Sequence, residues 1–383
     1  MRSWKLCCFW LPGHQSFERN ISMIKGHGVN KRKLAETIGC TVEEIIDMSS
    51  NLNPLGPPET IESFICSNVK EIRSLPEPDA GSMRNGFARF HGIDENRVVA
   101  GNGTTWFIYT LPLALGSKKV LILGPTYSDY KDACLMYHID FNHCLATASD
   151  SFLPDVDRLS GMAAGADTVF ICNPDNPTGA LILKDKIEYL LKRHKNTLFI
   201  IDESYLPFVE NAEDLSFVTD TGYQNLVVLS SMSKIYRIPG LRTGFLSAGP
   251  KIVEKMMAYY QPWSVNALAQ AVIEHIFGHP EEIEPFFRKT RAYVNAQRQR
   301  FTESLEGIKG LELFDSSTCF ILARLQEGLT SGEFCEKIGQ HRILIRDCFN
   351  FIGLSDQYVR FSLKTQRTND HLSTLIRQVM ENV

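Results

Sequence analysis

Lys234 is the residue of this sequence best placed to act as a nucleophile. It ends the tetrapeptide Ser-Met-Ser-Lys at 231–234, directly after a short apolar run, and Arg242 follows eight residues later. A lysine at the end of a buried strand is partly removed from water, which lowers its pKa and makes its neutral amine available. Two serine hydroxyls and an arginine beside it suit a phosphate dianion. An isolated Ser-x-x-Lys is more often a solvated loop, so other segments have to support this interpretation.

Two further segments carry polar groups directly after apolar runs. Asp202 opens the segment Asp-Glu-Ser-Tyr, and Asn176 lies within Asn-Pro-Asp-Asn-Pro-Thr-Gly at 173–179. A carboxylate in such a place can keep the nitrogen of a pyridine ring protonated, which makes the ring an electron sink. An amide can donate to an oxygen on the same ring. Each segment also has a plainer interpretation, a helix cap for Asp202 and a turn for the Asn-Pro segment.

A glycine-containing segment could bind the phosphate of the same ligand. The residues Gly-Asn-Gly-Thr-Thr at 101–105 end another apolar run and precede a helix that we expect to begin near Trp106. Backbone N–H groups and the helix dipole at such a helix start favour a phosphate. Tyr127 follows the next run and could stack on a flat heterocycle. Taken alone, the glycine segment is typical of a turn and the tyrosine of packing.

The elements that must position these residues form an α/β pattern. From about residue 98 onward, short apolar runs alternate with longer, more polar, helix-like segments. Continuous rather than alternating hydrophobicity is typical of strands buried on both faces of a mostly parallel sheet. Ligands of such sheets bind beyond the carboxyl ends of the strands, where the polar segments above are found. The runs are 98–100, 119–123, 168–172, 198–202, 227–230 and 243–247.

The length of 383 residues predicts two domains. A single core usually stops growing at roughly 250 to 300 residues. We predict a large ligand-binding α/β domain over 52–275 and a smaller α+β domain formed by 23–51 together with 276–383. The smaller domain is expected to contain a long helix at about 280–308 and strands at 319–324 and 358–363.

The composition excludes several classes of protein. It is 44% hydrophobic and 22% charged, as in ordinary soluble globular proteins, and the net charge of −4 gives no basic field for nucleic acid. The ten cysteines are scattered without metal-ligand spacing, which favours reduced thiols in a cytoplasmic protein and no metal site. No run reaches the roughly 20 apolar residues of a membrane helix. The apolar run at 6–11 faintly resembles a signal peptide, but residues 12–15 break it too early and no small-residue cleavage site follows, so 1–22 are expected to be a poorly structured extension.

Taken together, the polar segments resemble the fold type I pyridoxal-phosphate enzymes, the aspartate-aminotransferase-like fold, in type, order and spacing. The resemblance implies that pyridoxal 5′-phosphate is the cofactor, that Lys234 binds its aldehyde and that Asp202 pairs with its pyridine nitrogen. It places Tyr127 over the ring, as a third catalytic residue. It also implies a homodimer, because active sites of this fold lie at a subunit interface. The remaining cofactor contacts are assigned to Gly103, Thr104, Asn176, Tyr205, Ser231, Ser233 and Arg242.

Within this fold, the chain resembles the branch of histidinol-phosphate aminotransferases and L-threonine-O-3-phosphate decarboxylases, and it is more similar to the decarboxylases. The likeness rests on Ser-Ser-Asn-Leu-Asn-Pro-Leu-Gly at 49–56, on 261–269, and on Ile-Leu-Ile-Arg-Asp-Cys at 343–348 with Tyr-Val-Arg at 358–360. It extends from about Gly26 to the C-terminus. The implied reaction converts L-threonine O-3-phosphate or L-serine O-phosphate into the amino alcohol phosphate that serves as the nucleotide-loop linker of cobamides.

A substrate with both an α-carboxylate and a phosphate needs two anionic anchors, and arginine suits both. The resemblance assigns the carboxylate to Arg360 and the phosphate to Arg346. A surface ion pair is the plainer interpretation of either arginine. The resemblance also closes the substrate pocket with His27, Gly28 and Asn51.

Three positions depart from the decarboxylase pattern and bear on the substrate side of the site. Leu75 replaces a tyrosine that reaches the neighbouring subunit, Cys319 an asparagine, and Lys364 an arginine. One methyl group is worth only about 1 to 3 kcal/mol of discrimination, so the sequence does not choose between the two phosphorylated amino acids. A histidinol-phosphate aminotransferase and a non-catalytic ligand-binding protein of the same fold stay open as alternatives.

Overall fold

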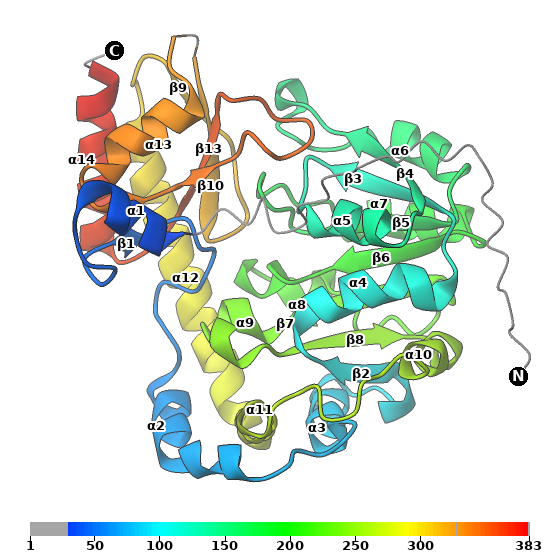
Figure 1. Cartoon of the computed structure of the whole chain (residues 1–383). Helices are drawn as coiled ribbons and strands as arrows, with labels where there is room; N and C mark the ends of the chain where they lie inside the picture. Colours follow the sequence, from blue (N-terminus) through cyan, green and yellow to red (C-terminus); the bar gives the residue numbers. More distant parts are fainter. Residues whose placement is uncertain (1–29, 327, 382–383) are drawn as a thin grey trace, which may run out of the picture.

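The computed structural model describes residues 30–326 and 328–381. His27, Gly28 and the expected extension over 1–22 lie outside the described residues. A large sheet covered by helices lies beside a smaller unit, and helix α12 (Pro280–Leu305) extends from one to the other (Figure 1). This helix matches the long helix predicted from the sequence.

The large sheet has seven strands in the order β2-β8-β7-β6-β5-β3-β4. The strands from β7 to β4 pair in parallel, whereas β8 is antiparallel to both of its neighbours. The predicted α/β class with a mostly parallel sheet is therefore confirmed. The strands are β2 (Val98–Gly101), β3 (Lys119–Gly124), β4 (Asp140–Leu145), β5 (Thr168–Cys172), β6 (Leu198–Asp202), β7 (Leu226–Ser231) and β8 (Gly244–Ala248).

Helices cover both faces of this sheet. Successive residues of each strand point to opposite faces, so both sets are buried. Ile171 and Ile201 join the core on the face of α3, α6, α7 and α11, whereas Phe170 and Ile200 pack on the face of α4, α5 and α10. Helix α4 begins at Gly103, three residues earlier than expected. The helices of this unit are α3 (Gly81–His91), α4 (Gly103–Leu115), α5 (Asp129–Met136), α6 (Val156–Ala163), α7 (Lys184–Arg193), α8 (Ala212–Leu215), α9 (Met232–Ile235), α10 (Pro250–Met257) and α11 (Ala267–Gly278).

The smaller unit contains a four-stranded antiparallel sheet in the order β12-β13-β10-β9 and a parallel pair, β1 with β11. The pair joins the N-terminal segment to the C-terminal part of the chain, since Ile46 is opposite Ile343. The domain limits at 51–52 and 275–276 stay predictions. The strands are β1 (Ile46–Asp47), β9 (Leu311–Leu313), β10 (Phe320–Leu325), β11 (Ile343–Leu344), β12 (Arg346–Asp347) and β13 (Tyr358–Ser362), with helices α1 (Lys31–Ile38), α13 (Ser331–Gly339) and α14 (Gln366–Glu381).

The remaining helical segments connect these layers. Helix α2 follows β1 and the segment at 49–52, and in the described part of the chain five short 3-10 helices join other elements. Among the described helices, none has the length and apolar character that a membrane crossing requires. The connecting segments are α2 (Glu59–Asn68), η1 (Val69–Arg73), η2 (Glu95–Arg97), η3 (Ala148–Asp150), η4 (Leu206–Phe208) and η5 (Pro239–Leu241).

Candidate active site

The predicted polar segments converge at one edge of the large sheet. Asp202 is the last residue of β6, and Lys234 lies on the short helix α9, directly after the neighbouring strand β7. Asn176 and Tyr127 follow β5 and β3. The carboxyl ends of parallel strands meet at the same edge of a sheet, which brings these four residues together.

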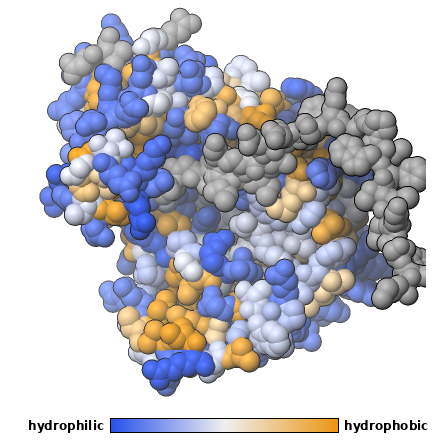
Figure 2. Space-filling view, viewed as in Figure 1, coloured by the Kyte–Doolittle hydropathy of each residue, from blue (hydrophilic) through white to orange (hydrophobic). Residues whose placement is uncertain are grey.

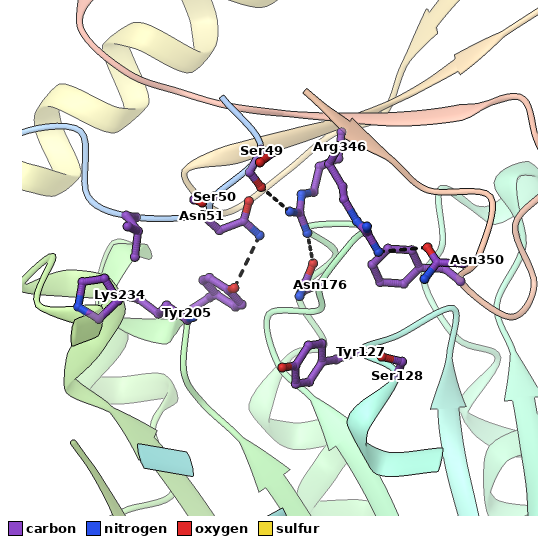
Figure 3. A pocket seen from close by; sticks show the side chains of 14 residues that line it. Ser49, Ser50, Asn51, Tyr127, Ser128, Asn176, Tyr205, Lys234, Arg346 and Asn350 are labelled. Atoms are coloured by element: carbon purple, nitrogen blue, oxygen red, sulfur yellow. Dashed lines mark hydrogen bonds between the residues drawn. The ribbon is translucent and has the colours of Figure 1, made fainter. Parts of the chain in front are cut away.

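A cavity of about 320 Å³ opens at this edge (Figure 3). Its walls come from both units, since the segment at 49–52, the strand β13 and the residues after β12 face the ends of the large sheet. Lys234 and Arg346 approach it from opposite sides in Figure 3. The predicted site residues that line the cavity are Asn51, Tyr127, Asn176, Tyr205, Lys234, Arg346 and Arg360.

The environment of Lys234 favours a neutral amine. Burial lowers the pKa of Lys234, and the nearby charge of Arg242 lowers it further, while Asp202 acts in the opposite direction. The backbone carbonyl of Lys234 accepts a hydrogen bond from the backbone N–H of Asn53 at 3.0 Å. A buried lysine with a lowered pKa is a competent nucleophile towards an aldehyde.

The carboxylate of Asp202 is buried and held by three donors. The backbone N–H and hydroxyl of Ser204 donate to Oδ1 at 2.9 and 2.5 Å, and the hydroxyl of Tyr130 donates to Oδ2 at 2.9 Å. Burial raises the pKa of Asp202, and the hydrogen bonds from Ser204 and Tyr130 oppose that rise. The carboxylate is thus fixed in orientation and suited to accept a hydrogen bond from a protonated ring nitrogen.

Tyr130 was not among the residues selected from the sequence. It lies on α5, and its ring is completely buried against Phe170. In the sequence it reads as a core aromatic residue, since nothing in its neighbours predicts a contact with a residue 72 positions away.

A second group of predicted residues lies beside the cavity without lining it. Gly244 of β8 is opposite both Gly101 of β2 and Ser231 of β7, so three strand ends meet there. An added Cβ at Gly244 would lie 2.8 Å from the backbone nitrogen of Thr104. The predicted residues of this group are Gly103, Thr104, Ser231, Ser233 and Arg242.

This second group fits a phosphate. The guanidinium of Arg242 lies at the start of α4 and donates to Oγ1 of Thr105 at 3.4 Å, and a Cβ on Gly103 would be 2.8 Å from its Nη2. Among the described residues, no carboxylate lies within 4.0 Å of Arg242. A positively charged side chain and the positive end of a helix dipole therefore face one place, which an anion would stabilise.

Asn176 and Tyr205 present polar groups at the middle of the cavity. Arg360 donates to Oδ1 of Asn176, which leaves the amide nitrogen of Asn176 available as a donor. Nδ2 of Asn51 donates to the hydroxyl of Tyr205 at 3.4 Å, and burial raises the pKa of this phenol. The aromatic ring of Tyr127 faces the same space (Figure 3). These residues fit a substituted pyridine ring that carries an oxygen.

Two arginines face the cavity from adjacent strands. Arg346 of β12 is directly opposite Arg360 of β13, and like charges in that arrangement destabilise a sheet. Arg360 donates to the carbonyl oxygen of Ser49 at 2.7 Å, while its buried Nε has no hydrogen-bond partner among the described residues. No described carboxylate lies within 4.0 Å of Arg360. An anion between the two guanidinium groups would relieve the repulsion.

The segment that carries Asn51 is tied to the smaller unit. Oδ1 of Asn51 accepts from the hydroxyl of Ser362 at 2.6 Å, and Nζ of Lys364 donates to the carbonyl oxygen of Ser50 at 2.8 Å.

Cys319 is completely buried nearby, and Leu75 is 81% exposed. No group of three or more described His, Cys, Asp or Glu side chains could hold a metal ion.

Comparisons with known proteins identify the family. The model of the family described as aminotransferase class I and II matches residues 43–377. The chain is 29% identical to the adenosylcobalamin biosynthesis bifunctional protein CobDQ of Leptospira interrogans, over 90% of this chain but only 40% of that protein. It is 28% identical to the histidinol-phosphate aminotransferase of Methanococcus aeolicus, over 92% of this chain and 95% of that protein.

A solved structure gives the same result. The crystal structure of L-threonine-O-3-phosphate decarboxylase from Porphyromonas gingivalis is 30% identical and matches with a TM-score of 0.78, over 88% of this chain and 100% of that chain. The family match covers nearly the whole of the described fold, which is that of the fold type I enzymes. The chain therefore belongs to the aminotransferase class I and II family, and its cofactor is pyridoxal 5′-phosphate.

Proposed function

We propose that this protein decarboxylates an O-phosphorylated hydroxy amino acid, either L-threonine O-3-phosphate or L-serine O-phosphate. The observation that carries the proposal is the pairing of Arg346 with Arg360 in the cavity that also contains Lys234. Two buried cations side by side suit a small molecule with two anionic groups. The product would be (R)-1-amino-2-propanol O-2-phosphate or ethanolamine O-phosphate, which serves as the nucleotide-loop linker of cobamides.

We assign the cofactor contacts as the resemblance implies. Lys234 would bind the aldehyde, and Asp202 would accept a hydrogen bond from the pyridine nitrogen. Tyr127 would cover the ring, while Asn176 and Tyr205 would donate to the ring oxygen. When bound, the cofactor supplies an electron sink for the electron pair left at Cα of the substrate. The cofactor phosphate would contact Gly103, Thr104, Ser231, Ser233 and Arg242.

The chain's own residues then control which bond breaks. Arg360 would hold the α-carboxylate and Arg346 the phosphate, so two anchors fix the rotation of the substrate about Cα. Asn51 would close the pocket over the bound amino acid, with His27 and Gly28. The α-carboxylate would leave as carbon dioxide, and its bonding electron pair would stay at Cα. Nζ of Lys234, which would take a proton from the substrate ammonium group as the substrate binds, would then donate that proton to Cα to complete the amino alcohol phosphate. Burial of Lys234 favours this role, because it holds the pKa of its amine below the ordinary value.

A histidinol-phosphate aminotransferase is the main alternative. The similarity to the enzyme of Methanococcus aeolicus supports it, at almost the same identity as the similarity to the bifunctional protein. Histidinol phosphate has no α-carboxylate, so Arg360 would instead bind a dicarboxylic co-substrate. A non-catalytic protein of the same fold is a third possibility, and the buried Lys234 with its lowered pKa argues against it.

Product identification tests the proposal. The protein loaded with cofactor would be incubated with L-threonine O-3-phosphate, with L-serine O-phosphate, and with histidinol phosphate plus 2-oxoglutarate. We expect release of carbon dioxide and an amino alcohol phosphate from at least one phosphorylated amino acid. Amino transfer from histidinol phosphate without any release of carbon dioxide would establish the aminotransferase instead. A wild-type protein that binds cofactor and turns over none of these would favour a binding protein.

We also propose that the protein is a cytoplasmic homodimer, as the resemblance implies. The exposed apolar side chains of Val69, Ile72 and Leu75 support a subunit contact, and so does Trp263, whose backbone N–H donates to the carbonyl oxygen of Pro78 at 2.9 Å. Figure 2 shows apolar surface over the region of α2 and α11 in Figure 1. Sedimentation equilibrium should give twice the chain mass of 43.3 kDa.

A further inference from the structure

The residues directly after β12 shape the end of the cavity that contains Arg346. Nη2 of Arg346 donates to Oδ1 of Asn350 at 2.9 Å, and the ring of Phe351 lies 5.0 Å from the guanidinium carbon. Both residues line the cavity, and Figure 3 shows the Asn350 side chain beside that of Arg346. Asn350 and Phe351 are neutral, so they fix the direction of the guanidinium without cancelling its charge.

Hydrogen bonds fix the backbone around Asn350, although it lies in a connection between two strands. The backbone N–H of Phe351 donates to the carbonyl oxygen of Cys348 at 3.1 Å, and that of Phe349 donates to Oδ1 of Asp347 at 3.0 Å. The Phe351 side chain is buried in a small core with Phe152, Phe314 and Tyr358. A turn and an aromatic anchor therefore set the position of Asn350.

The same segment packs against the large unit. Gly353 has a φ of +97°, and a Cβ there would lie 2.9 Å from Cδ2 of Leu145, at the end of β4. Ser128 lines the opposite wall of the cavity at the start of α5. The Arg346 end of the cavity is thus enclosed by both units, which limits the orientations that a bound group can adopt.

We propose that Asn350 is a positioning residue that gives the site its preference for a phosphate-bearing amine. The planar fork of arginine binds phosphate through two parallel hydrogen bonds only when its direction is set. Asn350 supplies that direction to Arg346, and Phe351 supports the flat face of the guanidinium. The inference rests on the proposed function in one respect, which is the assignment of Arg346 to the substrate phosphate.

The test compares one ligand with and without its phosphate. Binding of L-threonine O-3-phosphate and of L-threonine to the cofactor-loaded protein would be measured by titration of the visible absorption band. In Asn350→Ala, affinity for the phosphorylated amino acid should fall about tenfold, since a hydrogen bond that fixes a charged group is lost. Affinity for L-threonine should stay within about twofold, because its carboxylate is held elsewhere. Asn350→Asp should lose about 100-fold, because a carboxylate neutralises Arg346 and repels the phosphate.

A matched control exists outside the cavity. Asn295 on α12 accepts from Nη2 of Arg298 at 2.7 Å, the same type of contact at a place that does not line the cavity. Asn295→Ala should change neither affinity. Equal losses for both ligands in Asn350→Ala, or no change for either, would overturn the inference.

The inference and the proposed function can fail separately. Histidinol phosphate also carries a phosphate, so its titration should show the same tenfold loss if the protein is an aminotransferase. A wild-type protein that prefers phosphorylated ligands but releases no carbon dioxide would contradict the decarboxylase and leave the role of Asn350 intact. Carbon dioxide release by a variant with unchanged phosphate preference would contradict the role of Asn350 alone.

Discussion

The two sides of the cavity are built in different ways. The cofactor side comes from the ends of adjacent strands in one sheet, so Asp202, Lys234 and the residues near Gly244 are positioned by the pairing of β2, β8, β7 and β6. The substrate side combines the segment at 49–52 with β13 and the residues after β12, and its contact between Ser49 and Arg360 joins residues 311 positions apart in the sequence.

This difference separates cofactor binding from the choice of reaction. A sheet edge holds the backbone of its residues through many hydrogen bonds, so the backbone positions on the cofactor side do not depend on any single side-chain contact. The substrate side depends on a few side-chain contacts, such as those of Arg360 with Ser49 and Asn176. Related enzymes with one cofactor site can therefore differ in the reaction through a small number of changes on the substrate side. Variants on the two sides should give different phenotypes.

Replacement of Lys234 should have the largest effect of all. Lys234→Ala removes both the covalent attachment of the cofactor and the proton donor, so turnover should fall by about 10³-fold or more. The visible absorption band of the bound cofactor should change as well, while the circular dichroism of the folded protein stays the same. Lys195→Ala, at an exposed position, is the control. Turnover by Lys234→Ala at the wild-type rate would show that another residue does this chemistry.

The two arginines should separate the contributions of carboxylate and phosphate. Arg360→Gln should lower kcat/KM by about 100-fold, or about 3 kcal/mol, because a buried charge-assisted contact is lost. It should weaken binding of phosphorylated and unphosphorylated amino acids alike. Arg346→Gln should weaken only the phosphorylated ones, as measured by steady-state kinetics and by absorbance titration. If the two variants show the same selectivity, the assignment of one arginine to each anion is wrong.

Tyr130 provides a smaller test on the cofactor side. Tyr130→Phe removes one hydrogen bond to the Asp202 carboxylate, which should raise the pKa of Asp202 further and lower kcat/KM by about tenfold. Because the carboxylate would then accept a proton at higher pH, the acid limit of the pH–rate profile should move upward. Tyr189→Phe, at an exposed position, should leave the profile unchanged. An unshifted profile in Tyr130→Phe would mean that this phenol does not influence Asp202.

Asp175 should affect stability rather than catalysis. Burial raises the pKa of Asp175 to about 7 from an ordinary value of 3.8, and that of Glu203 to about 7 from 4.5. Between the ordinary pKa of each group and about pH 7, the folded protein retains protons that the unfolded chain has released. The free energy of unfolding therefore falls as pH rises across this range. Asp175→Asn should make this decline of the thermal midpoint less steep, and Glu203→Gln should do the same. An unchanged slope in both variants would mean that neither carboxyl group titrates in this range.

The sequence predicted the cofactor side better than the substrate side. Each apolar run that was predicted forms a strand, and the polar residues after these strands meet at one edge, because parallel strands bring their carboxyl ends together. Unlike β2 at the other edge of the sheet, which is buried throughout, β4 was missed, since Cys144 is its one fully buried residue and its other residues are exposed or partly buried. Its mixed polarity lacks the continuous apolar run of a central strand.

Other residues could not be selected because their contacts depend on tertiary structure. Tyr130 has the sequence context of a core aromatic, and only folding brings its hydroxyl to Asp202. Asn350 has the sequence context of a loop residue. Its contact with Arg346 depends on how the segment after β12 turns back. The opposition of Arg346 and Arg360 follows from strand register, which no local pattern specifies.

That register limits how the segment between β12 and β13 can change. Side chains opposite each other in an antiparallel pair project from the same face of a sheet, and a slip by one residue turns one strand over. A change in the length of the connection from Cys348 to Gln357 would leave Arg346 opposite Arg360, but it would displace Asn350 and Phe351 from the Arg346 guanidinium. A single-residue shift within either strand would instead point one guanidinium away from the ligand. Recognition of a doubly anionic molecule therefore depends on the register between two short strands.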